Sequence, residues 1–88
     1  MKLKLNKNLF KLLKSIHGID EYIDNNIKDD ESIVEFNIND SNVKEIQLLI
    51  NDEIASNGMN NKDTVNDLGL KLYKLYDEIL YQKNKQVL

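Results

Sequence analysis

Hydrophobic residues recur every three or four positions between Thr64 and Lys83, and this repeat is the strongest pattern in the chain. One line of apolar side chains runs along the stretch: Val65, Leu68, Leu72, Leu75 and Ile79. This spacing predicts an amphipathic helix over 64–83 that buries one face. Asp63 or Thr64 is expected to cap its start, with Thr64 and Asp67 forming a shortened capping box.

A second repeat of the same kind precedes this helix and predicts the other half of a helical hairpin. Its apolar positions are Val43, Ile46, Leu49, Ile50 and Ile54. We expect Asp40 or Ser41 to cap a helix over 41–57 and Gly58 to end it in a Schellman motif. The loop to the next helix is short, so the two helices should be antiparallel neighbours.

Two short stretches alternate instead, which indicates β-strands. Leu3 and Leu5 alternate with lysines, and the residues of 33–38 alternate between apolar and polar. If these strands pair, Glu35 comes to lie opposite Lys2 or Lys4 on the solvated face. The intervening connection of about 25 residues would permit a parallel pairing, which a tight turn would not.

The connection between the strands has helical spacing in two segments, followed by a polar loop at 28–31. Residues 7–16 place their leucines on one face, and 19–27 place isoleucines and Tyr22 on one face. Gly18 separates the two segments and suits the C′ position of the first helix. His17, the only histidine, is interpreted as a residue that serves the last carbonyls of that helix rather than as a general base.

These elements predict a small α+β domain that is mainly helical, with two short strands packed beside a helical hairpin. The single domain of 1–88 divides into strand-helix-helix-strand over 1–40, the hairpin over 41–84 and a loose tail at 85–88. An all-α bundle is the alternative, and it applies if residues 1–6 are helical from the start.

Composition narrows the classes of function. The chain has no cysteine and no arginine, and its net charge is −3. The absence of cysteine removes disulfides and thiolate metal sites, and the absence of arginine counts against sequence-specific binding to DNA. Lysines interrupt the N-terminal apolar residues, and no apolar run is long enough to cross a bilayer. We therefore expect a cytoplasmic protein, with no membrane partner, no metal and no cofactor.

Candidate interaction residues lie on the last predicted helix. Gly69 is costly inside a helix, which indicates close approach of another backbone, from this chain or from a second copy. Leu70 and Tyr81 fall outside the apolar line, on the same flank as Asp77. If this pair is contiguous with Tyr73, the group forms a surface for a protein partner or a homodimer.

Charged side chains provide two further candidate surfaces. Carboxylates that are close in sequence could form an acidic surface: Asp20, Glu21, Asp24, Asp29, Asp30 and Glu31. Their spacing does not match the oxygen ligands of a calcium loop. The alternative is a basic surface for nucleic acid, built from the N-terminal lysines Lys2, Lys4, Lys7, Lys11 and Lys14.

The stretch from Asn51 to Tyr81 resembles the C-terminal part of small uncharacterised proteins encoded by phages and prophages of low-G+C Gram-positive bacteria. The residues that carry the likeness are Asp52-Glu53-Ile54, Asn57-Gly58-Met59, Asp63 to Asn66, and Leu72-Tyr73 to Tyr76-Asp77-Glu78-Ile79. The resemblance implies a phage accessory context, in the cytoplasm of a bacterial host, and it supplies no catalytic motif. We therefore predict a non-enzymatic interaction protein, with an inhibitor of a host system as its specific form and a nucleic-acid-binding or transcription accessory protein as the alternative.

Overall fold

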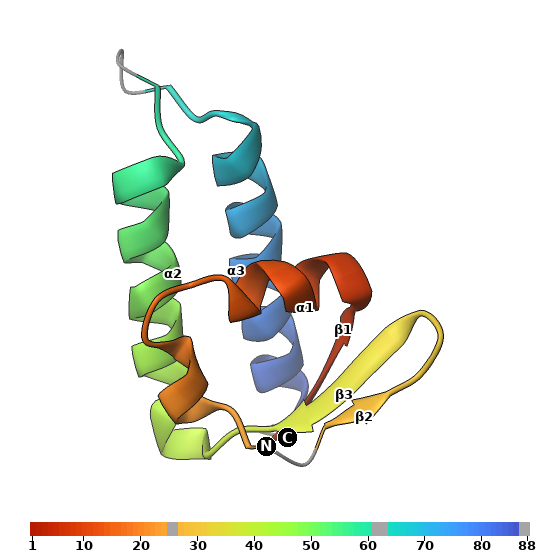
Figure 1. The fold of residues 1–88 in the computed structure, drawn as a ribbon. Helices are drawn as coiled ribbons and strands as arrows, with labels where there is room; N and C mark the ends of the chain where they lie inside the picture. Colours follow the sequence, from red (N-terminus) through yellow and green to blue (C-terminus); the bar gives the residue numbers. More distant parts are fainter. Residues whose placement is uncertain (25–26, 61–63, 87–88) are drawn as a thin grey trace.

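The computed structural model describes residues 1–24, 27–60 and 64–86. Its elements follow in the order β1 (Lys2–Asn6), α1 (Lys7–Lys14), the 3-10 helix η1 (Ile19–Tyr22), β2 (Lys28–Asp29), β3 (Ile33–Asn37), the 3-10 helix η2 (Asp40–Asn42), α2 (Val43–Asn57) and α3 (Asp67–Gln86). The helices α2 and α3 form an antiparallel hairpin beside the sheet and α1 (Figure 1). The mainly helical α+β fold is confirmed. The all-α alternative is wrong, because residues 2–6 form a strand.

The sheet has the strand order β1-β3-β2, and β3 runs antiparallel to both neighbours. Lys4 lies opposite Glu35, as the alternating pattern predicts. The parallel pairing of β1 with β3 that the long connection would permit does not form. Instead, α1 leads from β1 to β2, which runs parallel to β1, and a turn then returns β3 between them. Sequence reasoning missed β2, because it placed this two-residue strand in a polar loop.

The segment after Gly18 departs most from the predicted helix over 19–27. Only Ile19–Tyr22 are helical, as a 3-10 helix, and Ile23 is extended with φ −107° and ψ 126°. The backbone N–H of Asp24 donates to the carbonyl of Asn37 at 3.0 Å. This bond holds the chain extended beside the end of β3, which is incompatible with a further helical turn. Residues 25–26 of the predicted helix lie outside the described residues.

Asparagine side chains cap the N-termini of α1 and α3, which the sequence pattern does not predict. Asn6 caps α1, where its side chain accepts a hydrogen bond from the Leu9 N–H at 2.7 Å. Asn66 caps α3, where its Oδ1 accepts from the Gly69 N–H at 2.8 Å. The predicted cap at Thr64 is therefore wrong, and Asp63 lies outside the described part of the chain. Helix α3 also continues to Gln86, so residues 85–86 of the predicted tail are helical.

Gly58 and Gly69 bring the two helices of the hairpin into backbone contact. A Cβ built on Gly69 would lie 2.2 Å from the Gly58 carbonyl oxygen. The close approach expected at Gly69 is thus confirmed, and it occurs within one chain, in the first turn of α3. Gly58 ends α2 as predicted, but with φ −94° rather than the left-handed conformation of a Schellman motif. At this position glycine is needed for space.

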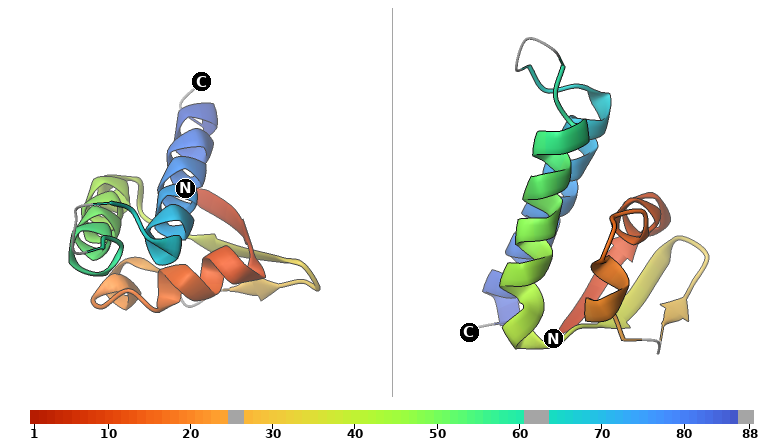
Figure 2. Two further views of the ribbon diagram at one scale, coloured as in Figure 1. Left: turned by 90° about the horizontal axis from the view of Figure 1, so that it is seen from above. Right: turned by 60° about the vertical axis from the view of Figure 1, so that its left-hand side comes forward.

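The helical hairpin lies on one side of the molecule, and the sheet and α1 lie on the other (Figure 2). The core is made of side chains from both sides. Its largest fully buried side chains come from every helix and strand except β2 and η2: Leu3, Leu5, Leu13, Ile19, Phe36, Val43, Ile46, Ile50, Leu72, Leu75 and Ile79. Phe10 of α1 packs on Phe36 of the sheet, with ring centroids 5.2 Å apart. The inner faces of α1 and α3 are therefore used for folding, and their outer faces remain for contacts with other molecules.

Candidate interaction surface

The outward face of α3 carries exposed apolar residues among charged ones. We define this face as Leu70, Tyr73, Lys74, Asp77 and Tyr81. Each of them lies three or four residues from another, so all five share one side of the helix. The side chains of Leu70, Tyr73 and Tyr81 are 55%, 40% and 54% exposed. The structure thus brings together four of the five predicted partner-binding residues. Gly69 does not join them, because it is buried against Gly58.

Tyr81 has a cationic neighbour one turn further along the helix. The Lys85 Nζ lies 4.9 Å from the centroid of the Tyr81 ring. A hydrogen bond with the Tyr81 side chain is the main cause that raises the pKa of Lys85, followed by the charge of the ionised phenol. The ammonium group of this lysine covers one side of the ring.

A groove between α1 and α3 borders this outward face. It has a volume of about 690 Å³ and is lined by Asn6, Asn8, Leu9, Lys11, Leu12, Ser15, Leu68, Lys71 and Lys74. Its leucines come from both helices and form an apolar surface beside three ammonium groups. Lys11, Lys71 and Lys74 make no ion pair within the described ranges. Sequence reasoning missed this site, because Lys71 and Lys74 meet Lys11 only when α1 packs across α3.

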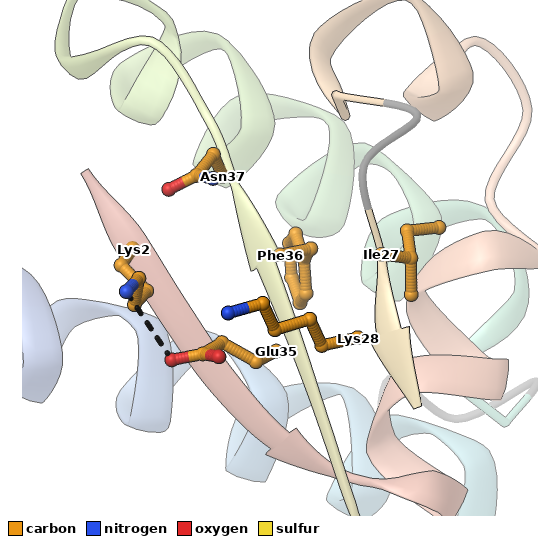
Figure 3. Close-up of a pocket in the computed structure, with 6 residues that line it drawn as sticks. All are labelled: Lys2, Ile27, Lys28, Glu35, Phe36 and Asn37. Carbon is orange, nitrogen blue, oxygen red and sulfur yellow. Dashed lines mark ion pairs between the residues drawn. The ribbon is translucent and has the colours of Figure 1, made fainter. Parts of the chain in front are cut away.

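The outer face of the sheet carries lysines and carboxylates, and one hollow on it is lined by Lys4, Lys28, Asp29, Asp30, Ile33 and Glu35. Glu35 lies between Lys4 of β1 and Lys28 of β2 in the strand register. Its Oε1 is 3.5 Å from the Nζ of Lys2. Figure 3 shows Lys28 on the same side of β3 as this ion pair, beside a hollow of about 370 Å³. Phe36, which also lines the hollow, belongs to the core, whereas Ile27 and Ile33 are 37% and 45% exposed and add apolar area to the charges of this face.

The predicted basic run does not form one surface. Lys2 pairs with Glu35, Lys7 lies 3.5 Å from Asp29, and Lys14 pairs with Asp20. Lys4 remains on the outer face of the sheet, whereas Lys11 lies in the groove beside α3. Neighbouring carboxylates therefore neutralise three of the five lysines, and the other two are on different elements.

The predicted acidic surface is also divided. Asp20 and Glu21 belong to η1, and Asp24 follows it. Asp29, Asp30 and Glu31 lie at the turn of the β2–β3 hairpin, which projects from the other end of the sheet layer (Figures 1 and 2). The pairs with Lys14 and Lys7 reduce the charge of both groups.

The described residues contain no group of three or more His, Asp or Glu side chains arranged to hold a metal ion. His17 is exposed in the turn between α1 and η1.

One buried polar group is not explained by the sequence pattern. The Nε2 atom of Gln47, in α2, has no hydrogen-bond partner within the described structure. No described helix combines the length and the apolar character that crossing a membrane requires.

Comparisons with protein-family models, curated proteins and solved structures find no match to this chain. The geometry of its surfaces is therefore the basis for a functional proposal.

Proposed function

We propose that this protein is a non-enzymatic protein-interaction module that docks through the outward face of α3. The observation that carries the proposal is the exposure of Leu70, Tyr73 and Tyr81 on one side of a helix. Clustered large apolar side chains at a surface are typical of contact sites, whereas single ones are common anywhere.

Folding alone does not account for the exposed apolar side chains of the outward face. Leu72, Leu75 and Ile79 anchor the opposite face of α3 and are fully buried. The helix is thus held in place without its outward residues, and a polar outward face would serve the fold equally well. Aromatic side chains such as Tyr73 and Tyr81 contribute large contact areas at protein interfaces.

The phage accessory context suggested by residues 51–81 is part of this proposal. Its specific form is inhibition of a host protein by occupation of a binding surface. The apolar outward face suits that role better than the acidic residues do, because the acidic residues lie in two separate groups. No catalytic group is needed for such a mechanism, which requires only affinity and a defined surface.

The proposal can be tested by a pull-down with the immobilised parent chain and its variants. Each would be incubated with an extract of a low-G+C Gram-positive bacterium to which an epitope-tagged second copy of the chain has been added. We expect retention of a protein by the parent chain and loss of that protein with the L70S/Y81S variant. The control is L48S, because Leu48 is 48% exposed but lies on α2. Equal retention by all three proteins, or no retention, would overturn the proposal.

A second candidate function follows from the groove between α1 and α3. Lys11, Lys71 and Lys74 could neutralise phosphates of a nucleic acid. With three phosphate contacts, the affinity for duplex DNA should fall roughly 40-fold between 50 and 200 mM salt. A fluorescence titration with DNA and RNA at low salt tests this function, using K71E/K74E as the variant and K44E on the exposed side of α2 as the control.

A further inference from the structure

We infer that the partner of the outward face of α3 is a second copy of the chain, packed antiparallel about a two-fold axis. This inference rests on the proposed function, because it names the occupant of the same surface. Along each α3, the axis lies at the level midway between residues Leu75 and Tyr76. It relates the two α3 helices so that each presents the same residues to the other.

Four of the five residues of the outward face are placed symmetrically about that point, and Tyr73 is the exception. Leu70 stands five and a half residues before it and Tyr81 five and a half after it, while Lys74 and Asp77 stand one and a half residues before and after. Spacings of four, three and four keep these residues on one stripe of the helix. Antiparallel pairing therefore places Leu70 opposite Tyr81, and Lys74 opposite Asp77, of the other copy.

Charge favours this arrangement over a parallel one. Antiparallel pairing forms two Lys74–Asp77 ion pairs, one on each side of the axis. Parallel pairing in register would instead place Lys74 beside Lys74 and Asp77 beside Asp77, which is repulsive. Neither residue has an ion pair with another described residue of its own chain. Both charges are thus available to a second copy, and apolar residues flank them at each end.

The size of the surface sets the expected strength of the dimer. Five side chains on one helix bury less than the roughly 1,200 Å² that stable specific interfaces bury in total. We therefore expect a reversible dimer with a dissociation constant in the micromolar range or weaker. Gly69 takes no part in it, because the Gly58 backbone already fills its open side.

Reversal of the two charges tests the pairing. Sedimentation velocity from about 10 µM to about 1 mM should show a dimer of the parent chain, weakened about tenfold or more in K74E and in D77K. The double variant K74E/D77K restores opposite charges across the axis and should recover the parent dissociation constant. K44E on α2 is the matched control. A parent chain that stays monomeric at about 1 mM, or a double variant that is not rescued, would overturn the inference.

Cysteine cross-linking then tests the direction of the helices, since the chain has no cysteine of its own. An equimolar mixture of L70C and Y81C, distinguished by a tag, should give a disulfide between the two variants. Each variant alone should give little, because like positions lie about 16 Å apart along antiparallel helices. A predominant L70C–L70C product would contradict the antiparallel arrangement. If the chain is monomeric but the outward face still retains a protein from the extract, the proposed function stands and only the second copy is the wrong occupant.

Discussion

The carboxamide of Gln82 occupies both outward backbone groups of Lys4. The Lys4 N–H donates to Gln82 Oε1 at 2.9 Å, and Gln82 Nε2 donates to the Lys4 carbonyl at 2.7 Å. One turn later, Gln86 Nε2 donates to the Lys2 carbonyl, also at 2.7 Å. In the described sheet β1 is an edge strand, so α3 supplies with side chains the bonds that another strand would make.

Removal of this clamp should weaken the attachment of α3 to the sheet. We expect Q82A to lower the free energy of unfolding by about 1–2 kcal/mol, because two partly solvated hydrogen bonds are lost. Urea unfolding followed by circular dichroism measures the change. Asn84→Ala, at an exposed position of the same helix, is the control, and an equal loss in both variants would show that the Lys4 contacts contribute nothing.

The contact between Gly58 and Gly69 predicts that alanine at position 69 destabilises the fold, although helix propensity favours alanine over glycine. Propensity alone predicts that G69A gains about 1 kcal/mol. The added methyl group would instead lie 2.2 Å from the Gly58 carbonyl oxygen and 2.7 Å from Val65 Cγ1. We expect a loss of about 2–3 kcal/mol in the free energy of unfolding. Ser56→Ala on the exposed side of α2 should be nearly neutral, and a stabilised G69A would refute the close contact.

Gln47 provides the opposite case, a position where an apolar residue should stabilise the fold. Its side chain is 8% exposed, and Nε2 has no hydrogen-bond partner among the described residues. Methionine has a similar length and no donor to satisfy. We expect Q47M to raise the free energy of unfolding by about 1 kcal/mol. A decrease in thermal unfolding experiments would indicate that the carboxamide has a partner in solution.

Lys85 and Tyr81 give a prediction for the pH dependence of the outward face. Y81F removes the phenol, so the pKa of Lys85 should move down toward its ordinary value, which NMR titration of the Lys85 side chain would measure. Because folding raises this pKa, the contact contributes to stability below the ordinary lysine pKa of about 10.4 and is lost as pH rises through the raised value. An unchanged Lys85 titration in Y81F would assign the shift to another group.

Periodicity was sufficient for the elements whose burial is one-sided and long. The α2–α3 hairpin and the strand at 33–37 bury alternate or every third to fourth residue, so their patterns are visible in the sequence. The same alternation predicted that Glu35 lies opposite Lys2 or Lys4, and the antiparallel pairing of the structure selects Lys4. The exposed group formed by Leu70, Tyr73, Asp77 and Tyr81 could also be predicted, because it depends on the geometry of one helix.

Features that depend on contacts between distant residues could not be predicted in this way. The two-residue strand β2 shows no alternation and exists because β3 offers it an edge. The segment after Tyr22 has helical spacing, yet the Asn37 carbonyl holds it extended. The groove needs Lys11 and Lys74 to meet across two packed helices, and the clamp on Lys4 needs Gln82, which lies 78 residues away.

The separation of 78 residues between Lys4 and Gln82 affects the order in which the chain acquires its structure. The α2–α3 loop is closed by local bonds such as the one from Asn66 Nδ2 to the Asn57 carbonyl, nine residues apart. The clamp on β1, by contrast, cannot close until Gln82 is synthesised, which takes about 4–16 s after Lys4 at ordinary translation rates. Until then, water is the partner for the outward N–H and carbonyl groups of Lys4. The final turns of α3 therefore act late, because they complete the hydrogen bonding of the outer edge of β1.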